Sequence, residues 1–249
     1  MKLIETFRSP NFDTRNNVKS IKYIILHYTA MTNHFEAIEH LCSNSNRVSS
    51  HYLISKKGTI YYLVDTKNRA WHAGDSFWKG LTDLNSHSIG IEIDNSGHHL
   101  HFEDYTTLQM NSLVRLISKL INEFKISIHN ILGHSDIAPY RKIDPGEKFP
   151  WKILKKKKIV YFQNVSNNQK GIVGNQNSTD LLSTNKDKKS LIMLKKIGYD
   201  TRNIKINSSA FKKLIESYQR HYRQNNISGK NDDQTYELIQ QHYKDVLTL

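Results

Sequence analysis

Short apolar runs alternate with amphipathic stretches along the first 160 residues. The sequence KKGT at 56–59 separates two of these runs and predicts a tight hairpin turn, with Gly58 at positive φ. Strands that alternate with helices are typical of an α/β fold, in which helices flank a central sheet. The runs with strand character lie at 21–28, 51–55, 59–64 and 88–94.

Helices are predicted by apolar residues that recur every three or four positions. The longest such pattern covers 105–124 and includes Leu108. A second helix is expected at 34–42, where Cys42 is predicted to be a small buried apolar residue. A third and shorter helix is expected to start near Pro150.

The periodic pattern stops at 161–180, which is rich in Asn, Gln, Ser and Gly and is predicted to be a linker. Only helical patterns follow it. The chain is therefore expected to contain an α/β domain at 1–160 and a small three-helix domain at 181–249. Because few contacts should cross a polar linker, cutting near Asn175 should leave an N-terminal fragment that folds alone.

Composition excludes some classes of function. The 249 residues carry a formal net charge of +13, but no arginine-rich stripe or nucleic-acid-binding motif accompanies it, so no nucleic-acid partner is expected. A modest attraction to an anionic polymer is compatible with this charge. No stretch approaches the roughly 18 apolar residues of a membrane-spanning helix, so no membrane span is expected. A single cysteine excludes an internal disulfide.

The N-terminal sequence MKLIETFRSPNFDTRNN bears on the cellular compartment. It turns polar at once and lacks the apolar core of a secretory leader. A cytoplasmic protein is therefore expected. A periplasmic or secreted protein is the alternative, if a leader has been removed or an unusual export route applies. We expect a monomer.

Two histidines and an aspartate are candidates for a metal site. His27 ends the apolar run IILHYT, His134 ends the run NILGH, and Asp144 follows ten positions later in a loop rich in Pro and Gly. Two imidazoles and one carboxylate make a catalytic zinc set whose fourth position is left to water. Zinc lowers the pKa of such a water to about 7. A histidine at a strand end is more often structural, so spacing alone leaves both interpretations open.

Several motifs together favour the metal interpretation. From about Ser9 to Leu154 the chain resembles the zinc amidases of the AmpD-like and AmiD-like group (amidase type 2), relatives of a phage lysozyme and of peptidoglycan recognition proteins. The motifs occur in the family's order and spacing, which implies a mixed central β-sheet flanked by helices. They are SPNFDTR, ILHYTA, VSSHYLISKKGTIYYLV, RAWHAG, SIGIEI and GHSDIAPYRKIDPGEKFPW.

The resemblance implies a role for five residues. His27, His134 and Asp144 would hold one zinc ion per chain. Glu92, in SIGIEI, matches the family's catalytic glutamate, which acts as general base and then as proton donor to the leaving amine. Lys142 matches the lysine that stabilises the tetrahedral oxyanion. The implied reaction is zinc-dependent hydrolysis of the amide between N-acetylmuramic acid and the L-alanine of the stem peptide, in cell-wall turnover or recycling.

Without the motif, Glu92 and Lys142 have plainer interpretations. Glu92 could be the solvent-facing residue of an apolar strand, and Lys142 an ordinary surface lysine. Isoleucines occupy the alternate positions around Glu92, so it shares a face with Gly90 and Asp94. That face is small and polar, as expected for a strand beside a cleft.

The motif RAWHAG contributes two candidate substrate-binding residues. Trp71 and His72 are expected to line the substrate cleft, as the family pattern implies, although Trp71 could equally be a core aromatic residue. Tyr140 is a departure, because many relatives have Gly there. Its ring could narrow the cleft near the stem peptide.

The chain has 13 histidines, so any single one is weak support for a metal site. His51, in SHYLIS, is expected to be structural. His98, His99 and His101, in NSGHHLHF, are expected to lie exposed in a loop and not to form a second metal site.

Residues 181–249 resemble the small three-helix peptidoglycan-binding domain in the sequences LKKIGYD, YQRHYR and NISGKNDDQT. The match departs from the family at Tyr218, where Phe is usual, and a generic helical appendage is the alternative. If the resemblance holds, this domain keeps the enzyme on glycan strands and raises the local substrate concentration.

The sequence gives two conflicting indications of the substrate. The absent leader favours the soluble 1,6-anhydro-muropeptides of recycling, whereas the helical domain favours polymeric peptidoglycan. We expect activity on both. A non-catalytic peptidoglycan recognition protein is the alternative function. Such relatives have lost a metal ligand, whereas Asp144 is present here.

Overall fold

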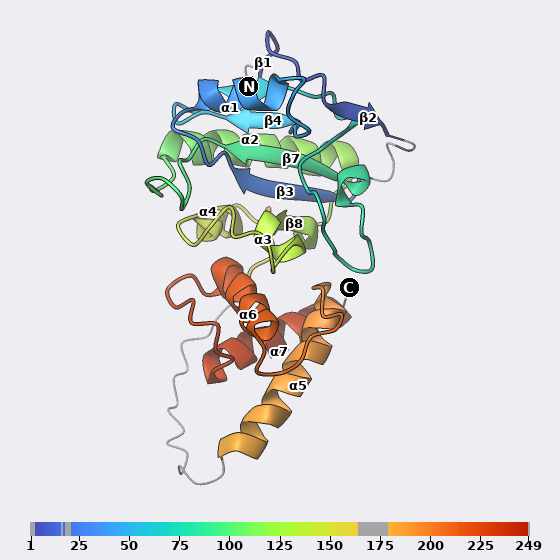
Figure 1. Ribbon diagram of the computed structural model, residues 1–249, viewed down its shortest axis with the longest axis vertical. Coiled ribbons are helices and arrows are strands. Elements are labelled where there is room, and N and C mark those ends of the chain that lie inside the picture. Colours follow the sequence, from blue (N-terminus) through green and yellow to red (C-terminus); the bar gives the residue numbers. More distant parts are fainter. Residues whose placement is uncertain (1–2, 16, 18–20, 164–178, 249) are drawn as a thin grey trace.

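The structure, a computed structural model, describes residues 3–15, 17, 21–163 and 179–248. A mixed six-stranded sheet forms its centre, as the sequence predicted, and only the pair of neighbours at 52–54 and 60–62 is antiparallel (Figure 1). In spatial order the strands are β1 (Leu3–Ile4), β5 (Ile60–Tyr62), β4 (Tyr52–Ile54), β7 (Ser88–Ile93), β3 (Tyr23–Tyr28) and β8 (Ile131–Gly133). A separate antiparallel pair consists of β2 (Phe12–Thr14) and β6 (Asn68–Ala70).

One face of the sheet is covered by the long helix α2 (Thr107–Phe124), as Figure 1 shows. Thr106 caps it in a capping box with Gln109, which explains why the helix begins there. Its apolar stripe packs on the isoleucines of β7. Leu108, assigned to that stripe from spacing, lies outside it and is 57% exposed. The short helix α4 (Trp151–Lys156) adds Trp151 to the same core.

Helix α1 (His34–Cys42) covers part of the opposite face. Asn33 caps it by accepting hydrogen bonds from the backbone N–H groups of Phe35 and Glu36. Its buried residues pack against Leu53 of β4. Cys42 is only half-buried at the border of this cluster, and burial raises the pKa of its thiol.

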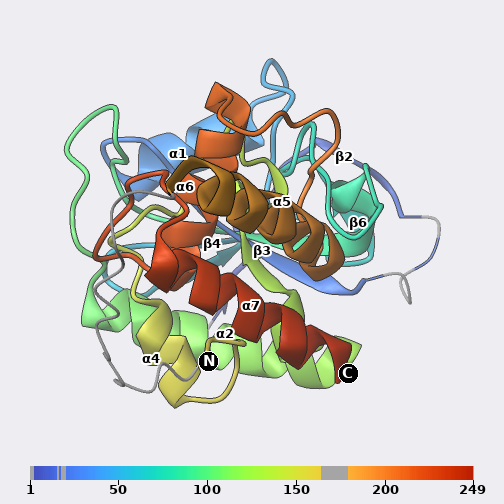
Figure 2. The same ribbon diagram turned by 90° about the horizontal axis from the view of Figure 1, so that it is seen from below.

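The rest of that face meets the three predicted C-terminal helices. These are α5 (Thr179–Ile197), α6 (Ser209–Tyr222) and α7 (Asp233–Leu247). They lie below β8 and the short helix α3 (His134–Ile137), which is between β8 and α6 in Figure 1. Figure 2 shows α5, α6 and α7 from below, crossing under the sheet. Short 3₁₀ helices, η2 and η3, occupy Leu84–His87 and Ile128–Asn130. Within the described ranges, no helix combines the length and the apolar character needed to cross a bilayer.

The helical region shares an apolar core with the sheet. Ile25 of β3 belongs to the same buried cluster as Leu214 and Tyr218 of α6. The expectation that few contacts would connect the two parts is therefore wrong. The predicted linker at 161–180 falls largely outside the described residues, but its first residues pack on the helices: Tyr161 donates a hydrogen bond from its hydroxyl to Asp245 (2.8 Å).

Candidate metal centre and active site

Three parallel strands bring the predicted site residues to one edge of the sheet. His27 pairs with Glu92 across β3 and β7, and Leu26 pairs with Gly133 across β3 and β8. Paired residues point to the same face, so His27 and Glu92 both face the side that carries α1 and the helical region. His134 starts α3 directly after β8, at the same edge.

His27, His134 and Asp144 converge at this edge, and all three are buried. His27 Nδ1 lies 3.0 Å from His134 Nδ1 and 3.1 Å from Asp144 Oδ2, and His134 Nδ1 lies 3.0 Å from the same oxygen. Across the described part of the chain, this is the one group of at least three His, Cys, Asp or Glu residues placed to hold a metal ion together.

A chain of hydrogen bonds behind His27 assigns the protons on its ring. Ser88 Oγ donates to the Leu84 carbonyl (2.5 Å), so the same oxygen accepts from His72 Nε2 (3.1 Å). A neutral His72 then has a proton-free Nδ1, which accepts from His27 Nε2 (3.1 Å). The Nδ1 lone pair of His27 therefore faces His134 and Asp144.

His134 is oriented in the same way, because its Nε2 donates to the Ala73 carbonyl (3.0 Å). Two Nδ1 lone pairs and a carboxylate oxygen thus face one another without a proton, which is repulsive unless a cation lies among them. Four-coordinate zinc holds N and O ligands at about 2.0–2.2 Å, which separates them by roughly 3.3–3.6 Å. The observed separations of 3.0–3.1 Å are close to this, so the donor set fits a metal ion.

The electrostatics of His27 agree with metal binding. Burial lowers the pKa of His27 to about 4. A metal requires a neutral imidazole, and this shift favours the neutral ring.

Glu92 lines the same cavity as the three ligands. Its Oε2 is buried and has no hydrogen-bond partner among the described residues, so the solvent-facing alternative for Glu92 is wrong. Burial and then the Asp144 carboxylate raise its pKa well above the usual value, and Lys142 acts in the opposite direction. A buried carboxyl oxygen without a hydrogen-bond partner in the protein is suited to accept and return a proton.

The cavity has a volume of about 210 Å³ and is enclosed on one side by Ala37 and Leu41 of α1. Lys142 contributes to its wall from the segment after α3, where its backbone N–H donates to the Ala138 carbonyl (2.9 Å). The cavity thus brings together the three metal-ligand candidates, one carboxyl group and one lysine. His72 also lines it, as predicted.

Trp71 does not line this cavity, and its indole Nε1 donates to Asp13 (2.7 Å). It is half-buried and lies outside the apolar core, so the alternative of a core aromatic residue is wrong. His51 is structural, as expected, because it is buried and its Nδ1 accepts from the backbone N–H of Gly90 (3.0 Å).

The three histidines of the sequence NSGHHLHF differ in exposure. His99 and His101 are exposed, as expected. His98 is half-buried instead, because its two ring nitrogens contact the Tyr28 hydroxyl (3.1 Å) and the Glu147 carboxylate (3.1 Å). Among the described residues, this loop does not bring three potential metal-ligating side chains together.

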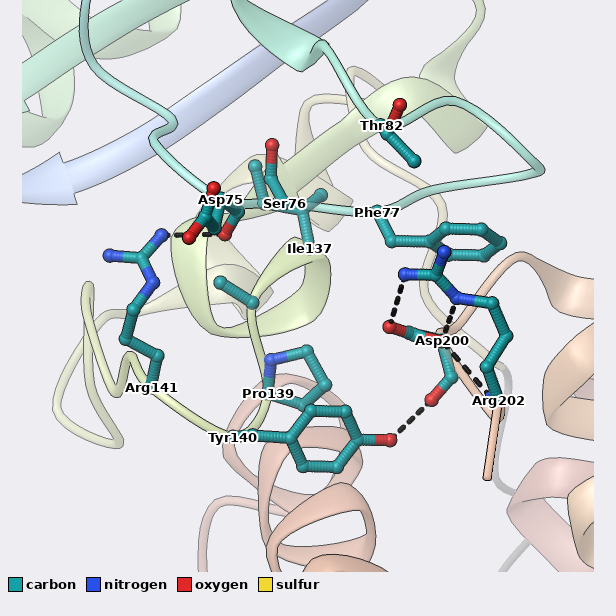
Figure 3. Close-up of a pocket in the computed structure, with 11 residues that line it drawn as sticks. Asp75, Ser76, Phe77, Thr82, Ile137, Pro139, Tyr140, Arg141, Asp200 and Arg202 are labelled. Atoms are coloured by element: carbon teal, nitrogen blue, oxygen red, sulfur yellow. Dashed lines mark hydrogen bonds and ion pairs between the residues drawn. The ribbon is translucent and has the colours of Figure 1, made fainter. Parts of the chain in front are cut away.

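Tyr140 does not line the cavity that contains Glu92, so its ring does not narrow that cavity. Its hydroxyl donates to the Asp200 carbonyl, in the segment between α5 and α6 (Figure 3). It lines a second cavity of about 410 Å³, together with Arg141 and Arg202, beside the C-terminal end of α3. This cavity contains none of the three metal-ligand candidates, and its walls come from both parts of the chain.

The sequence did not reveal that His72 orients the ring of His27. The available signal was Gly90, because the His72 ring packs directly against it. A Cβ at Gly90 would lie 2.4 Å from His72 Cγ, so only glycine leaves room for that ring. Replacing Gly90 with alanine is expected to displace the ring and cost about 1–3 kcal/mol of unfolding free energy. Urea denaturation measures this loss, and an unchanged midpoint would show that the ring has space to move.

Comparisons with known proteins find similar sequences and similar folds. The family model described as N-acetylmuramoyl-L-alanine amidase matches residues 17–147. The N-acetylmuramoyl-L-alanine amidase AmiD of Escherichia coli (strain K12) is 31% identical over 245 residues, which cover 92% of this chain and 86% of AmiD.

Two solved structures are similar over nearly the whole chain. AmpDh3 of Pseudomonas aeruginosa has a TM-score of 0.76 and 27% identity, covering 96% of both chains. AmiD from E. coli, in complex with the substrate anhydro-N-acetylmuramic acid-L-Ala-D-gamma-Glu-L-Lys, has a TM-score of 0.75 and 28% identity, covering 91% of this chain and 90% of AmiD. The similarity therefore includes the helical region as well as the sheet.

Proposed function

The chain belongs to the N-acetylmuramoyl-L-alanine amidase family, and on this premise we propose that it hydrolyses the amide between N-acetylmuramic acid and the L-alanine of the stem peptide. The observation that carries the proposal is the convergence of His27, His134 and Asp144 beside the unpaired carboxyl group of Glu92. Amide hydrolysis requires an electrophile, a proton shuttle and a cation near the developing negative charge. This cavity has a candidate for each.

We assign His27, His134 and Asp144 as the ligands of one zinc ion per chain. Zinc bound there would polarise the scissile carbonyl and make a water molecule nucleophilic near neutral pH. Two hydrogen bonds orient the rings for metal binding: His27 donates to His72, and His134 donates to the Ala73 carbonyl. The Nδ1 lone pairs of both rings therefore point toward the carboxylate of Asp144.

We assign Glu92 as the group that moves the proton. Its carboxylate accepts a proton from the attacking water and returns it to the amine of L-alanine as the amide breaks. Burial and the Asp144 carboxylate raise its pKa, which makes a stronger base of the carboxylate that accepts the proton. The ammonium group of Lys142 is assigned to the oxyanion that develops on the carbonyl oxygen.

We propose two forms of the substrate. The complex of AmiD with an anhydro-N-acetylmuramic acid peptide favours 1,6-anhydro-muropeptides. Peptidoglycan is the second, because the helical region resembles a peptidoglycan-binding domain and the net charge of +13 favours an anionic wall polymer. Mass spectrometry of products from purified anhydro-muropeptides and from sacculi, run side by side, tests both. Release of intact stem peptide beginning at L-alanine is expected from each, and its absence from both would contradict the activity.

The metal assignment predicts a specific pattern among histidine variants. Purified protein is expected to contain about one zinc per chain by elemental analysis, and His134→Ala is expected to lose it, because two remaining ligands hold zinc poorly. His98→Ala is the control, since His98 is a half-buried histidine in the loop without a metal site. Stoichiometric zinc in His134→Ala would remove the assignment. Loss of zinc in His98→Ala would place the ion elsewhere.

A further inference from the structure

The metal ligand His134 begins a helix that is too short to be stable without contacts to the rest of the protein. Helix α3 spans only His134–Ile137, and a single helical turn is unstable in isolation. Its geometry must therefore come from bonds to its surroundings. One of these bonds runs toward the metal centre, because the backbone N–H of Ser135 donates to the carbonyl of Asp144 (2.9 Å). Helix α3 thus fixes two candidate ligands relative to each other.

The side chain of Asp136 is the second support of this helix. It is fully buried, and its Oδ2 accepts from the backbone N–H of Gly133 (2.7 Å), directly before His134. This hydrogen bond ties the carboxylate to the strand end from which His134 projects. A buried carboxylate requires several hydrogen bonds, and one backbone N–H is too few.

The remaining hydrogen bonds to Asp136 come from the helical region. The Tyr199 hydroxyl donates to its Oδ1 (2.7 Å), and His221 Nδ1 donates to its Oδ2 (2.7 Å). Ser217, one turn before His221 on α6, donates from its hydroxyl to the carbonyl of Ser135 (2.7 Å). All three donors are buried.

The donor His221 is itself held in place. Its ring stacks on Trp151, with centroids 3.6 Å apart and planes 16° from parallel, and on Tyr222 at 4.0 Å. Trp151 belongs to the apolar core between the sheet and α2. The His221 ring is therefore clamped between α4 and its own helix, and it presents its Nδ1 donor to Asp136 in a fixed direction.

We propose that the helical region is a positioning element of the metal centre, with Tyr199 and His221 holding the metal ligand His134 through Asp136. The inference rests on the metal site assigned above. The helical region then completes the catalytic domain in addition to any contact with the wall. Loss of either donor leaves a buried carboxylate short of a hydrogen bond, so that α3 relaxes and the ligands lose their alignment.

A purely stabilising interface would give a different result, and two tyrosines distinguish the cases. Tyr199→Phe removes the hydroxyl that binds Asp136. Tyr161→Phe removes a half-buried link, from the Tyr161 hydroxyl to Asp245 of α7 (2.8 Å), which joins the same two parts without touching α3. Each substitution deletes one oxygen, so both variants are expected to fold.

The test measures zinc affinity of the full chain by competition with a chelator, together with thermal unfolding. Both variants are expected to lower Tm. Only Tyr199→Phe is expected to weaken zinc binding, by about 10-fold, at the low end of the range for groups that orient metal ligands. His221→Ala should weaken it at least as much, and His221→Asn should restore part of it because its amide places a donor near the Nδ1 position.

The outcomes separate this inference from the proposed function. Wild-type zinc affinity in Tyr199→Phe, together with a lowered Tm, would overturn the positioning role and leave the metal site intact. Equal weakening in Tyr161→Phe would also overturn it, because the effect would then follow general stability. A wild-type chain that binds no zinc would overturn the metal site itself, and the positioning role with it.

Discussion

Replacing Glu92 with glutamine is expected to lower turnover of a muropeptide about 10²–10⁴-fold, the usual contribution of a general acid–base group. Glutamine keeps the shape of the side chain but neither accepts nor returns a proton in the required range. Because Glu92 is not one of the three converging ligands, the variant is expected to retain about one zinc per chain. Steady-state hydrolysis and elemental analysis on the same preparation measure both quantities.

Asp94→Asn is the matched control for this substitution. Asp94 is a buried carboxylate that directly follows β7, two residues after Glu92. Its Oδ2 accepts a hydrogen bond from the backbone N–H of Lys56 (3.2 Å). It does not line the cavity that contains Glu92. Its variant is expected to keep turnover within a few-fold. If both variants lost activity equally, the loss would be structural, and near-normal activity in Glu92→Gln would assign the proton transfer to another group, with His72 as the next candidate.

His27, His134 and Asp144 were singled out through the motifs of the family, because spacing alone left a structural role open, and the structure brings their side chains together. A buried strand ends near His27, another apolar run ends at Gly133, and parallel strands place such ends at one edge. Alternation along the strand predicted which residues share a face with Glu92, but its position opposite His27 is a register that only the structure gives. Helix α1 was likewise predicted over its observed span, because its apolar spacing and the Asn33 cap are local.

The incorrect expectations involve partners that are distant in the chain. Tyr140 was expected in the cleft, but its hydroxyl contacts Asp200, 60 residues away. Leu108 has helical spacing, yet only the packing of the whole helix decides which apolar residues of the first turn are covered. Asp136 has no periodic or motif signal for its role, because that role depends on Tyr199 and His221. Such contacts become visible only once the two parts of the chain are placed together.

Removing the helical region is expected to have the largest effect on stability. A fragment ending at Gln163 would expose Tyr23, Ile25, Leu132 and Ile137, which are covered by the shared apolar cluster in the full chain. Full burial of such a side chain contributes about 1.5–3 kcal/mol, so even half of it lost at four positions amounts to about 3–6 kcal/mol. The free energy of unfolding of a native protein is only about 5–15 kcal/mol. The contacts therefore revise the expectation, drawn from the polar linker, of an independently folding fragment.

The fragment 1–163 is expected to aggregate or to unfold at least about 10 °C below the full chain, and to bind zinc more weakly. Coexpression with a separate 176–249 chain is the control, because the shared core should reassemble from two pieces and restore both properties. Hydrolysis of soluble anhydro-muropeptides and of sacculi should then fall together in the fragment and recover together in the pair. A simple wall-binding tether would instead spare the soluble substrate, since tethering changes only local concentration. A fragment with the full-length Tm and normal turnover of soluble muropeptides would show that the contacts of α3 with α6 are dispensable for the catalytic site.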